Sequence, residues 1–358
     1  MDNIINKTKN QDISNSNTTY KKEKGQFFTT NYKYILQNLN IPNYIENIIE
    51  PFTGNGDLLN FISKDKNIVC YDIDPKKNFI IKRDTILNPP KYKNKFVITN
   101  PPYLARNKSN DKTIFDKYHY NDLYKCFIYQ LIESECSGGI LIIPLNFWCS
   151  IRKTDIYLRK CFVKKFSVIH LNIFEEKVFD DTSYTICSFQ FELKNNNNNN
   201  IESTIHPLNK KMVLLLNSDN NYTIGGEIYK LLQNKNIKIE RLTKNNNNSE
   251  FKTNILVKCI DNNINSKICL KYVNDNEIFI DDTPKLSARS YATLIIEPKL
   301  NEEQQKELIK QFNDYLENQR DKYHSLFLTN YRESNSIARK RISFNLVFNI
   351  INYLLQTE

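Results

Sequence analysis

Short apolar runs that end in polar or glycine-containing turns dominate the first half of this chain. Four of them, Ile48–Ile49, Ile68–Tyr71, Phe96–Thr99 and Ile140–Pro144, have the length and β-branched content of buried strands. Between the last two, Phe127–Leu131 predicts a helix. Strands that alternate with helices are typical of an α/β fold with a largely parallel sheet.

Two further runs complete this sheet, and low-complexity segments follow it. Ile80–Asp84 predicts a short strand, and Cys187–Leu193 alternates as a half-buried strand does.

The asparagine runs Asn195–Asn200 and Asn245–Asn248 predict loops, and the first of them predicts a domain boundary. We therefore expect a disordered polar tail at 1–20, a first domain at 21–194 and a second at 195–358. In the second domain we expect strands at 212–216, 255–260, 268–273 and 292–296, and helices at 301–318 and 342–355.

Polar side chains follow several of these strands. Gly54 and Gly56 come directly after the first strand, where a tight glycine turn brings backbone N–H groups close to a ligand. Asp72 ends the second strand, where a carboxylate can accept hydrogen bonds from both ribose hydroxyls of a nucleoside. Asp84 ends the third. Each feature alone also fits an ordinary turn; their order along one sheet edge favours a nucleoside site.

The fourth strand ends in Asn100-Pro101-Pro102-Tyr103, a stiff turn at the carboxyl edge of the predicted sheet. The Asn100 amide oxygen and the Pro101 carbonyl can accept both N–H bonds of an amino group such as that of adenine. This leaves the nitrogen lone pair facing an electrophile and stabilises the positive charge that develops. Tyr103 can stack on a planar base. The alternative is a proline turn that merely closes a strand.

Composition indicates a partner class and a compartment. The 358 residues carry a formal net charge of +10, which favours a polyanionic partner, although AT-rich coding DNA also yields lysine-rich chains. The 8 cysteines form no Cys-x-x-Cys pair, so we expect reduced, buried thiols and no metal site. The chain has no apolar signal region and no run of membrane-spanning length. A soluble intracellular protein is expected.

Together these motifs resemble those of S-adenosylmethionine-dependent DNA amino-methyltransferases of the adenine-N6 type, over roughly residues 24–194. Gly25–Thr30 is similar to the N-terminal cofactor motif, although Thr30 replaces its usual proline. Glu50–Asp57 resembles the glycine motif that cradles the methionine part, and Asn100–Tyr103 matches the catalytic motif in full. The resemblance implies a Rossmann-like class I methyltransferase fold, with a mixed seven-stranded sheet flanked by helices and a smaller α+β target-recognition domain. It also implies these cofactor-binding residues: Phe28, Thr29, Glu50, Pro51, Phe52, Gly54, Gly56, Asp72, Ile73, Asp84, Thr85 and Asn100.

The same resemblance implies the roles of other residues. Phe179 is similar to a second aromatic residue that, with Tyr103, holds a flipped target base. The segment 104–122 lacks apolar periodicity and is expected to be a lid over the DNA that orders only on binding. DNA contacts are expected from Arg106, Lys108, Arg332, Arg339 and Arg341. The alternatives are a solvated connector for the first two and a charged helix start for the last three.

The expected activity is therefore methyl transfer from S-adenosylmethionine to adenine N6 in double-stranded DNA. The protein would act as a monomer or weak dimer, and a cognate restriction endonuclease is a possible partner. Cytosine N4, RNA adenine N6 and a protein glutamine amide remain alternative acceptors, because all present an amino group to the same motif. A catalytically inactive nucleic-acid-binding module is the alternative from a different class.

Overall fold

The computed structural model describes residues 28–179, 184–195, 199–261, 267–282, 290–328, 330–334 and 337–356. The chain divides into two compact units. The first comprises residues up to 147 together with 152–216, and the second comprises 148–151 together with the residues from 217 onward. The expected tail at 1–20 and residues Lys24–Phe27 of the N-terminal motif lie outside the described residues.

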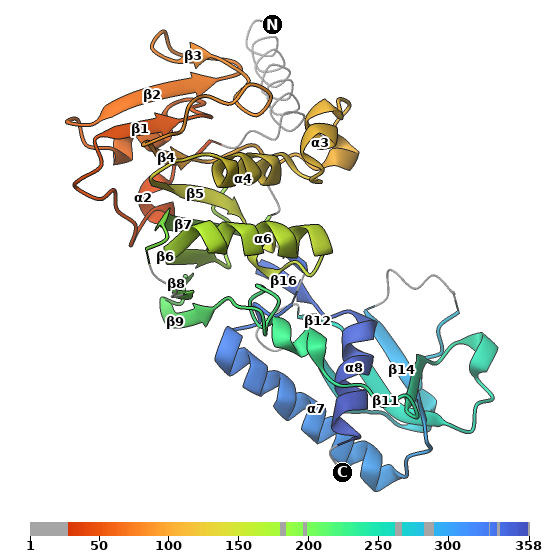
Figure 1. The fold of residues 1–358 in the computed structure, drawn as a ribbon. Helices are drawn as coiled ribbons and strands as arrows, with labels where there is room; N and C mark the ends of the chain where they lie inside the picture. The colour runs from red at the N-terminus through yellow and green to blue at the C-terminus, as the bar shows by residue number, and fades with distance from the viewer. Residues whose placement is uncertain are drawn as a thin grey trace, which may run out of the picture. The chain divides into compact units, whose positions relative to one another are not determined.

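A nine-stranded sheet forms the centre of the first unit, in the order β3-β2-β1-β4-β5-β7-β6-β8-β9 (Figure 1). Strands β1 to β5 are parallel, whereas β7 runs antiparallel to both β5 and β6. The first seven strands therefore form the mixed sheet expected for a class I methyltransferase fold. Their bounds are β1 Asn47–Glu50, β2 Asn67–Asp72, β3 Ile81–Lys82, β4 Phe96–Thr99, β5 Gly138–Pro144, β6 Phe166–Phe174, β7 Ile186–Leu193, β8 Asn200–His206 and β9 Lys210–Leu215.

The last two strands of this sheet correct the expected seven-stranded sheet and its boundary at residue 194. Strand β8 pairs in parallel with β6, and β9 pairs antiparallel with β8. Because Ile201 and Ile205 of β8 and Leu214 of β9 are buried, the two strands belong to the core of the first unit. The boundary therefore lies at 216–217, and the strand expected near 212–216 belongs to the first unit.

Helices cover this sheet. Figure 1 shows α4 and α6 side by side across the sheet, and the two helices contact each other. Helix α4 is buried around most of its surface, which agrees with its largely apolar sequence. The helices of the first unit are α2 Tyr32–Ile35, α3 Thr113–Tyr118, α4 Leu123–Glu133 and α6 Lys153–Lys165; α5, Asn146–Cys149, spans the division between the units.

An aromatic cluster fills the space between α6 and the sheet. Phe162 of α6 is fully buried, and its ring centroid lies 5.0 Å from that of Phe166, 5.2 Å from Phe191 and 5.9 Å from Phe189. Phe147 packs edge-on against the same ring at 6.1 Å. These contacts fix α6 against strands β6 and β7.

The second unit contains two further sheets. A four-stranded antiparallel sheet has the order β10-β14-β11-β13, and a three-stranded sheet has the order β12-β16-β15. The expected strands near 255–260, 268–273 and 292–296 and both expected helices are present, so the unit is α+β. The bounds are β10 Lys238–Arg241, β11 Lys252–Lys258, β12 Ile260–Asp261, β13 Cys269–Tyr272, β14 Tyr291–Glu297, α7 Glu302–Tyr323, β15 Asn330–Ser334, β16 Ile337–Arg341 and α8 Phe344–Leu354.

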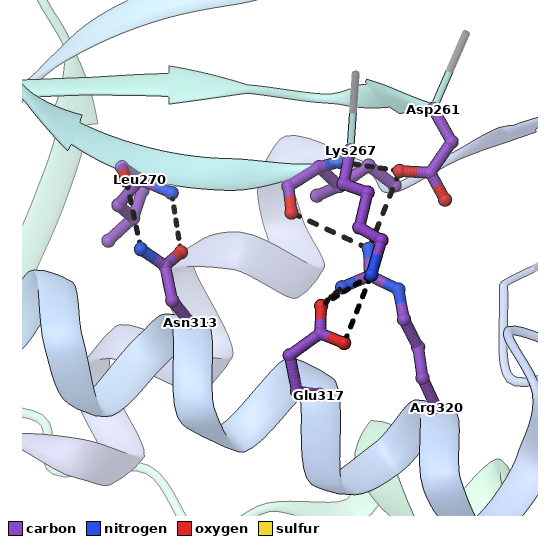
Figure 2. Close-up of polar contacts among 7 residues, drawn as sticks. Asp261, Lys267, Leu270, Asn313, Glu317 and Arg320 are labelled. Atoms are coloured by element: carbon purple, nitrogen blue, oxygen red, sulfur yellow. Dashed lines mark hydrogen bonds and ion pairs between the residues drawn. The ribbon is translucent and has the colours of Figure 1, made fainter. Parts of the chain in front are cut away.

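Polar contacts fasten α7 to the strands that it packs against, as Figure 2 shows. The Asn313 amide accepts a hydrogen bond from the Leu270 N–H (2.9 Å) and donates one to the Leu270 carbonyl (3.1 Å). Two turns further along α7, Arg320 donates to Glu317 (2.6 Å) and pairs with Asp261 of β12 at 3.4 Å. Since β12 pairs with β16, Arg320 ties the three-stranded sheet to α7.

Candidate functional site

A cavity of about 300 Å³ opens at the carboxyl ends of β1, β2, β3 and β4. At least one residue at or just after the end of each strand lines the cavity: Gly54, Asp72, Asp84 and Asn100. Parallel strands bring their carboxyl ends to one edge, where ligands bind in open α/β sheets. The expected residues that line the cavity are Phe28, Thr29, Phe52, Gly54, Asp72, Ile73, Asp84, Thr85, Asn100 and Pro102.

The glycine turn is held by the acid of the neighbouring strand. Gly54 and Gly56 have φ angles of +53° and +81°, values that residues with a side chain rarely adopt. Asp72 Oδ2 accepts the Gly54 N–H at 2.7 Å, and its Oδ1 accepts the Asp74 N–H at 2.8 Å. Each oxygen keeps a lone pair, so Asp72 both fixes the turn and retains acceptor capacity towards the cavity. The turn continues into a short 3-10 helix, Asp57–Phe61.

Replacing Gly54 by alanine is expected to destabilise the protein by about 1–2 kcal/mol, because an alanine resists positive φ. Its Cβ would also lie 3.1 Å from Phe28 Cε1, so the Phe28 ring, which lines the cavity, would have to move by a few tenths of an ångström. Urea denaturation measures the stability. Gly225→Ala, at φ +61° in the second unit, is the comparison in which steric overlap adds to the same backbone strain: its Cβ would lie 2.6 Å from Phe327 Cβ, so it should cost more than Gly54→Ala. Unchanged stability in Gly54→Ala would contradict the strained turn.

The loop after β3 supplies the other end of the cavity. Asp84 Oδ1 accepts the N–H groups of Ile86 (3.1 Å) and Leu87 (2.9 Å), whereas its Oδ2 accepts no hydrogen bond from the described residues. Thr85 donates to the Pro51 carbonyl at 2.9 Å and so joins this loop to the glycine turn. Ile73 lines the cavity although it is 43% exposed, which suits packing against a flat ligand.

Glu50 lies beneath the turn and does not line the cavity. Its Oε1 accepts hydrogen bonds from the Phe52 N–H (3.3 Å) and from the Thr99 hydroxyl, while its buried Oε2 has no hydrogen-bond partner in the described residues. Burial, with a smaller contribution from Asp72, raises the pKa of Glu50 from 4.5 to about 8. A neutral carboxyl at this position couples the end of β1 to the end of β4.

This buried acid predicts a pH dependence of stability. Between pH 4.5 and about 8 the unfolded chain ionises Glu50 while the folded chain keeps it protonated, so the stability falls as the pH rises. The slope from one such group is up to about 1.4 kcal/mol per pH unit. We expect Glu50→Gln to show a weaker decline than the unchanged protein in urea denaturation at pH 5.5, 6.5 and 7.5. The exposed control Glu135→Gln should leave the slope unchanged, and an equal slope for Glu50→Gln would contradict this account.

Asn100 lies between the N-terminal motif and the following turn. Its Nδ2 donates to Thr29 Oγ1 at 3.1 Å, and the Tyr103 hydroxyl donates to its Oδ1. The same hydroxyl lies 2.7 Å from the Ile142 carbonyl, a second acceptor for its one proton. Burial raises the pKa of Tyr103 well above its usual value, which keeps the hydroxyl a donor. The Pro101 carbonyl accepts no hydrogen bond from the described residues.

The two aromatic residues expected around a target base are buried in this structure. Tyr103 is 3% and Phe179 is 6% exposed, and neither lines the cavity. The Tyr103 ring packs edge-on against Tyr124 (6.0 Å) and Tyr184 (6.3 Å). In this structure the Tyr103 ring is therefore not presented to the cavity. The cavity lining also leaves out Glu50, Pro51, Gly56 and Pro101, which belong to the ends of β1 and β4 and the turns that follow them.

The segment 104–122 is folded, which corrects the expected lid that orders only on binding. It contains α3, whose Phe115 is buried, and Tyr118 donates to the Ile86 carbonyl at 3.0 Å. The apolar residues of α3 lie too close together in a short segment to give a clear period in the sequence. Ser109, Asp111 and Ile114 of this segment line the cavity, and so do Asp57, Arg83 and Leu123, which the sequence interpretation also missed.

The expected DNA contacts lie in different settings. Arg106 forms an ion pair with Asp116 at the surface, and Lys108 is exposed. Arg332 and Arg339 occupy facing positions of the β15–β16 ladder, where a charged helix start had been the alternative; their side chains lie outside the described part. Arg341 pairs with Asn330 in the same ladder.

The part of the chain that the structure describes contains neither a candidate metal-ion site nor a candidate membrane-spanning helix. No group of three or more histidine, cysteine or acidic side chains is arranged to hold a metal ion. None of the described helices combines the length and the apolar character needed to cross a bilayer.

Comparisons with known proteins give structural similarity only. No family model and no curated protein sequence matches this chain. The type IIG restriction endonuclease BpuSI is similar at 14% identity and a TM-score of 0.39, over 62% of this chain and 36% of that one. The type I restriction-modification methyltransferase subunit from Streptococcus thermophilus is similar at 13% identity and a TM-score of 0.36, over 51% of this chain and 48% of its own. The chain thus spans less than half of either protein, and likeness of this degree does not define a function.

Proposed function

We propose that this protein is an S-adenosylmethionine-dependent methyltransferase that modifies adenine N6 in double-stranded DNA. The observation that supports the proposal most strongly is that Asn100, Asp72 and Asp84 line one cavity although they follow three different strands. A proline turn that only closed a strand would have no reason to share that cavity with both acids. The complete Asn-Pro-Pro-Tyr sequence makes an amino group the favoured acceptor.

The cavity fits such a cofactor. Ile73 offers an exposed apolar surface to an adenine ring, and the unused Asp84 Oδ2 can accept its amino group. Asp72 keeps lone pairs for the ribose hydroxyls, and a Cβ at Gly54 would fill the space against Phe28. S-adenosylmethionine supplies a methyl group activated by its sulfonium charge.

The chain's own contribution to transfer is position and charge stabilisation. Asn100 Oδ1 and the free Pro101 carbonyl accept the two N–H bonds of the target amino group and direct its lone pair towards the methyl carbon. The new nitrogen–carbon bond forms as the sulfur–carbon bond breaks with its electron pair on sulfur, and the nitrogen then releases a proton to solvent. Tyr103 must move its hydroxyl or share Asn100 Oδ1 for this to occur.

The target adenine has to leave the DNA stack to reach this turn. Tyr103 and Phe179 are the proposed stacking partners, which requires that their buried rings become exposed when DNA binds. We propose the second unit as the DNA-recognition domain, with Arg332, Arg339 and Arg341 on the β15–β16 ribbon and Arg106 and Lys108 near the turn as contacts. In this sheet β12 pairs with Arg341 and Lys340 of β16, whereas Arg339 lies opposite Arg332 of β15. Paired β-strands are among the elements that the major groove admits.

The decisive experiment identifies the modified atom. Duplex DNA of mixed sequence is incubated with the protein and methyl-labelled S-adenosylmethionine, digested to nucleosides and separated by chromatography. We expect label in N6-methyl-2′-deoxyadenosine, and roughly 10²- to 10³-fold slower labelling with Asn100→Ala. Label in N4-methyl-2′-deoxycytidine, or in RNA or a protein glutamine when these substrates replace the DNA, would move the proposal to the corresponding acceptor. The absence of any cofactor binding by calorimetry would favour a binding module. Sequencing of DNA from expressing cells then gives the recognition site, and co-purification tests for a cognate endonuclease.

A further inference from the structure

A cluster of buried polar side chains joins α2 and the turn after it to the sheet. Asn172 of β6, Ser188 of β7 and His206 of β8 are each at most 1% exposed. The Ser188 hydroxyl donates to the Ile35 carbonyl, and the Asn172 amide donates to the Gln37 carbonyl. Because a buried polar network with satisfied hydrogen bonds is rigid, the cluster fixes α2 relative to β6, β7 and β8.

The same stretch of chain reaches the cavity. Phe28 and Thr29, which line it, lie just before α2, and the Thr29 hydroxyl accepts a hydrogen bond from Asn100. In the helical turn that follows, the Ile35 N–H donates to the Asn31 carbonyl at 3.1 Å. Since a single helical turn separates the cavity wall from the polar cluster, we expect a change in the cluster to reach that wall.

Hydrogen-bond partners place a hydrogen on one ring nitrogen of His206. The Gln37 carbonyl can only accept, so the Asn172 atom that faces it is the amide nitrogen, Nδ2. Asn172 Oδ1 therefore faces His206 Nε2 at 3.3 Å and accepts from it, as it also does from Asn38. Nε2 thus carries a hydrogen in the neutral and in the charged ring alike, and Nδ1 is the atom that gains or loses the proton.

Two side chains at Nδ1 of His206 require opposite protonation states. The Gln37 amide nitrogen lies 3.4 Å from Nδ1 and donates to it when Nδ1 has its lone pair. Asn209 Oδ1, in the turn between β8 and β9, lies 3.1 Å from Nδ1 and accepts only when Nδ1 carries a hydrogen. The neutral ring therefore holds the α2 side of the cluster, whereas the charged ring holds the β8–β9 turn.

Burial and charge set the protonation state of His206. The titratable residues of the elements around it are Tyr34 of α2, His170 of β6, Glu175 and Glu176 after β6, and Lys211 of β9. Burial lowers the pKa of His206 below its usual 6.5, although the negative charge of Glu176 acts in the opposite direction. The ring is therefore neutral near pH 7 and becomes charged only below pH 6.5.

We propose that His206 is a positioning residue for the cofactor site: its neutral ring holds the segment that carries Phe28 and Thr29, and protonation of Nδ1 releases that segment. The inference rests on the proposed use of the cavity for S-adenosylmethionine, and it concerns a residue that does not line the cavity. A ligand that binds the held arrangement better favours the neutral ring, so cofactor affinity falls as the pH drops below 6.5.

Calorimetric titration with S-adenosylhomocysteine at pH 7.5 and pH 5.0 tests this role. His206→Asn cannot be charged in this range and should remove a roughly 3- to 10-fold part of the loss of affinity in acid, as for one hydrogen bond. Glu50 and Asp122 titrate in or near the same range in both proteins, so only the difference between the two is assigned to His206. His119→Asn makes the same change at an exposed histidine with φ +60°, which asparagine tolerates, and should leave the pH dependence unchanged.

Two further variants leave the buried ring in place and act in opposite directions. Gln37→Ala removes the partner of the neutral ring, so the affinity at pH 7.5 should drop by roughly 3-fold and the additional loss at pH 5.0 should disappear. Asn209→Gly removes the partner of the charged ring, and glycine keeps the φ of +52°, so the loss at pH 5.0 should become smaller.

The other outcomes overturn the inference in distinguishable ways. Equal pH dependence in the unchanged protein and in His206→Asn would show that His206 does not act on the cofactor site. Equal losses from Gln37→Ala and Asn209→Gly at both pH values would show that the cluster supports the fold alone. If the unchanged protein bound no S-adenosylhomocysteine at either pH, the proposed cofactor would fail first and the inference with it.

Discussion

The Asn100→Ala variant is expected to lose methyl transfer by roughly 10²- to 10³-fold, the usual effect of removing one group that stabilises developing charge. Alanine leaves the Pro101 carbonyl as the single acceptor for the target amino group. The nitrogen lone pair is then no longer directed, and the positive charge on nitrogen loses its nearest oxygen. Label incorporation into duplex DNA under single-turnover conditions measures the effect.

Cofactor affinity separates this result from a collapse of the site. Asn100 also donates to Thr29, but the cavity keeps Asp72, Ile73 and Asp84, so the affinity should change only a few-fold. Asn100→Asp retains a carbonyl-type acceptor and should recover part of the rate. Asn107→Ala makes the same truncation at an exposed position and serves as the control. A variant at residue 100 that keeps most of its activity would refute the proposed role.

Truncation of Phe162 to alanine should lower the free energy of unfolding by about 3–5 kcal/mol, the typical cost of a large cavity in a core. Phe162 is fully buried among four phenylalanines, which come from α5, β6 and β7 and cannot all move into the space. Urea denaturation measures the loss.

Phe79→Ala removes the same side chain from a position that is 57% exposed, and it should cost less than about 1 kcal/mol. Similar losses for Phe79→Ala and Phe162→Ala would contradict the prediction, because they would show that burial of Phe162 in the aromatic cluster adds no stability. A large loss confined to Phe162→Ala would identify the contact of α6 with the sheet as a main source of stability in the first unit.

The sequence by itself determined the strands and turns that carry the site. Strands β1, β2, β4 and β5 are short apolar runs that end in glycine, proline or acidic residues, so local composition marks both their presence and their carboxyl ends. Since parallel strands share one edge, Asp72, Asp84 and Asn100 could be assigned to one region before any coordinates were known. The cavity contains all three.

Only the tertiary structure decided the features that depend on distant partners. Strand β8 has polar residues beside the asparagine run, and its assignment follows from pairing with β6, about 30 residues earlier. The burial of Tyr103 depends on Tyr124, Tyr184 and the Ile142 carbonyl, none of which its own motif specifies. The Asp72 carboxylate accepts two backbone hydrogen bonds, whereas the Asp57 carboxylate accepts none from the described residues, and composition alone does not distinguish the two. Local sequence sets backbone preference and strand ends. Strand pairing, the burial of aromatic rings and the hydrogen bonds that a carboxylate accepts instead depend on contacts that form when the chain folds.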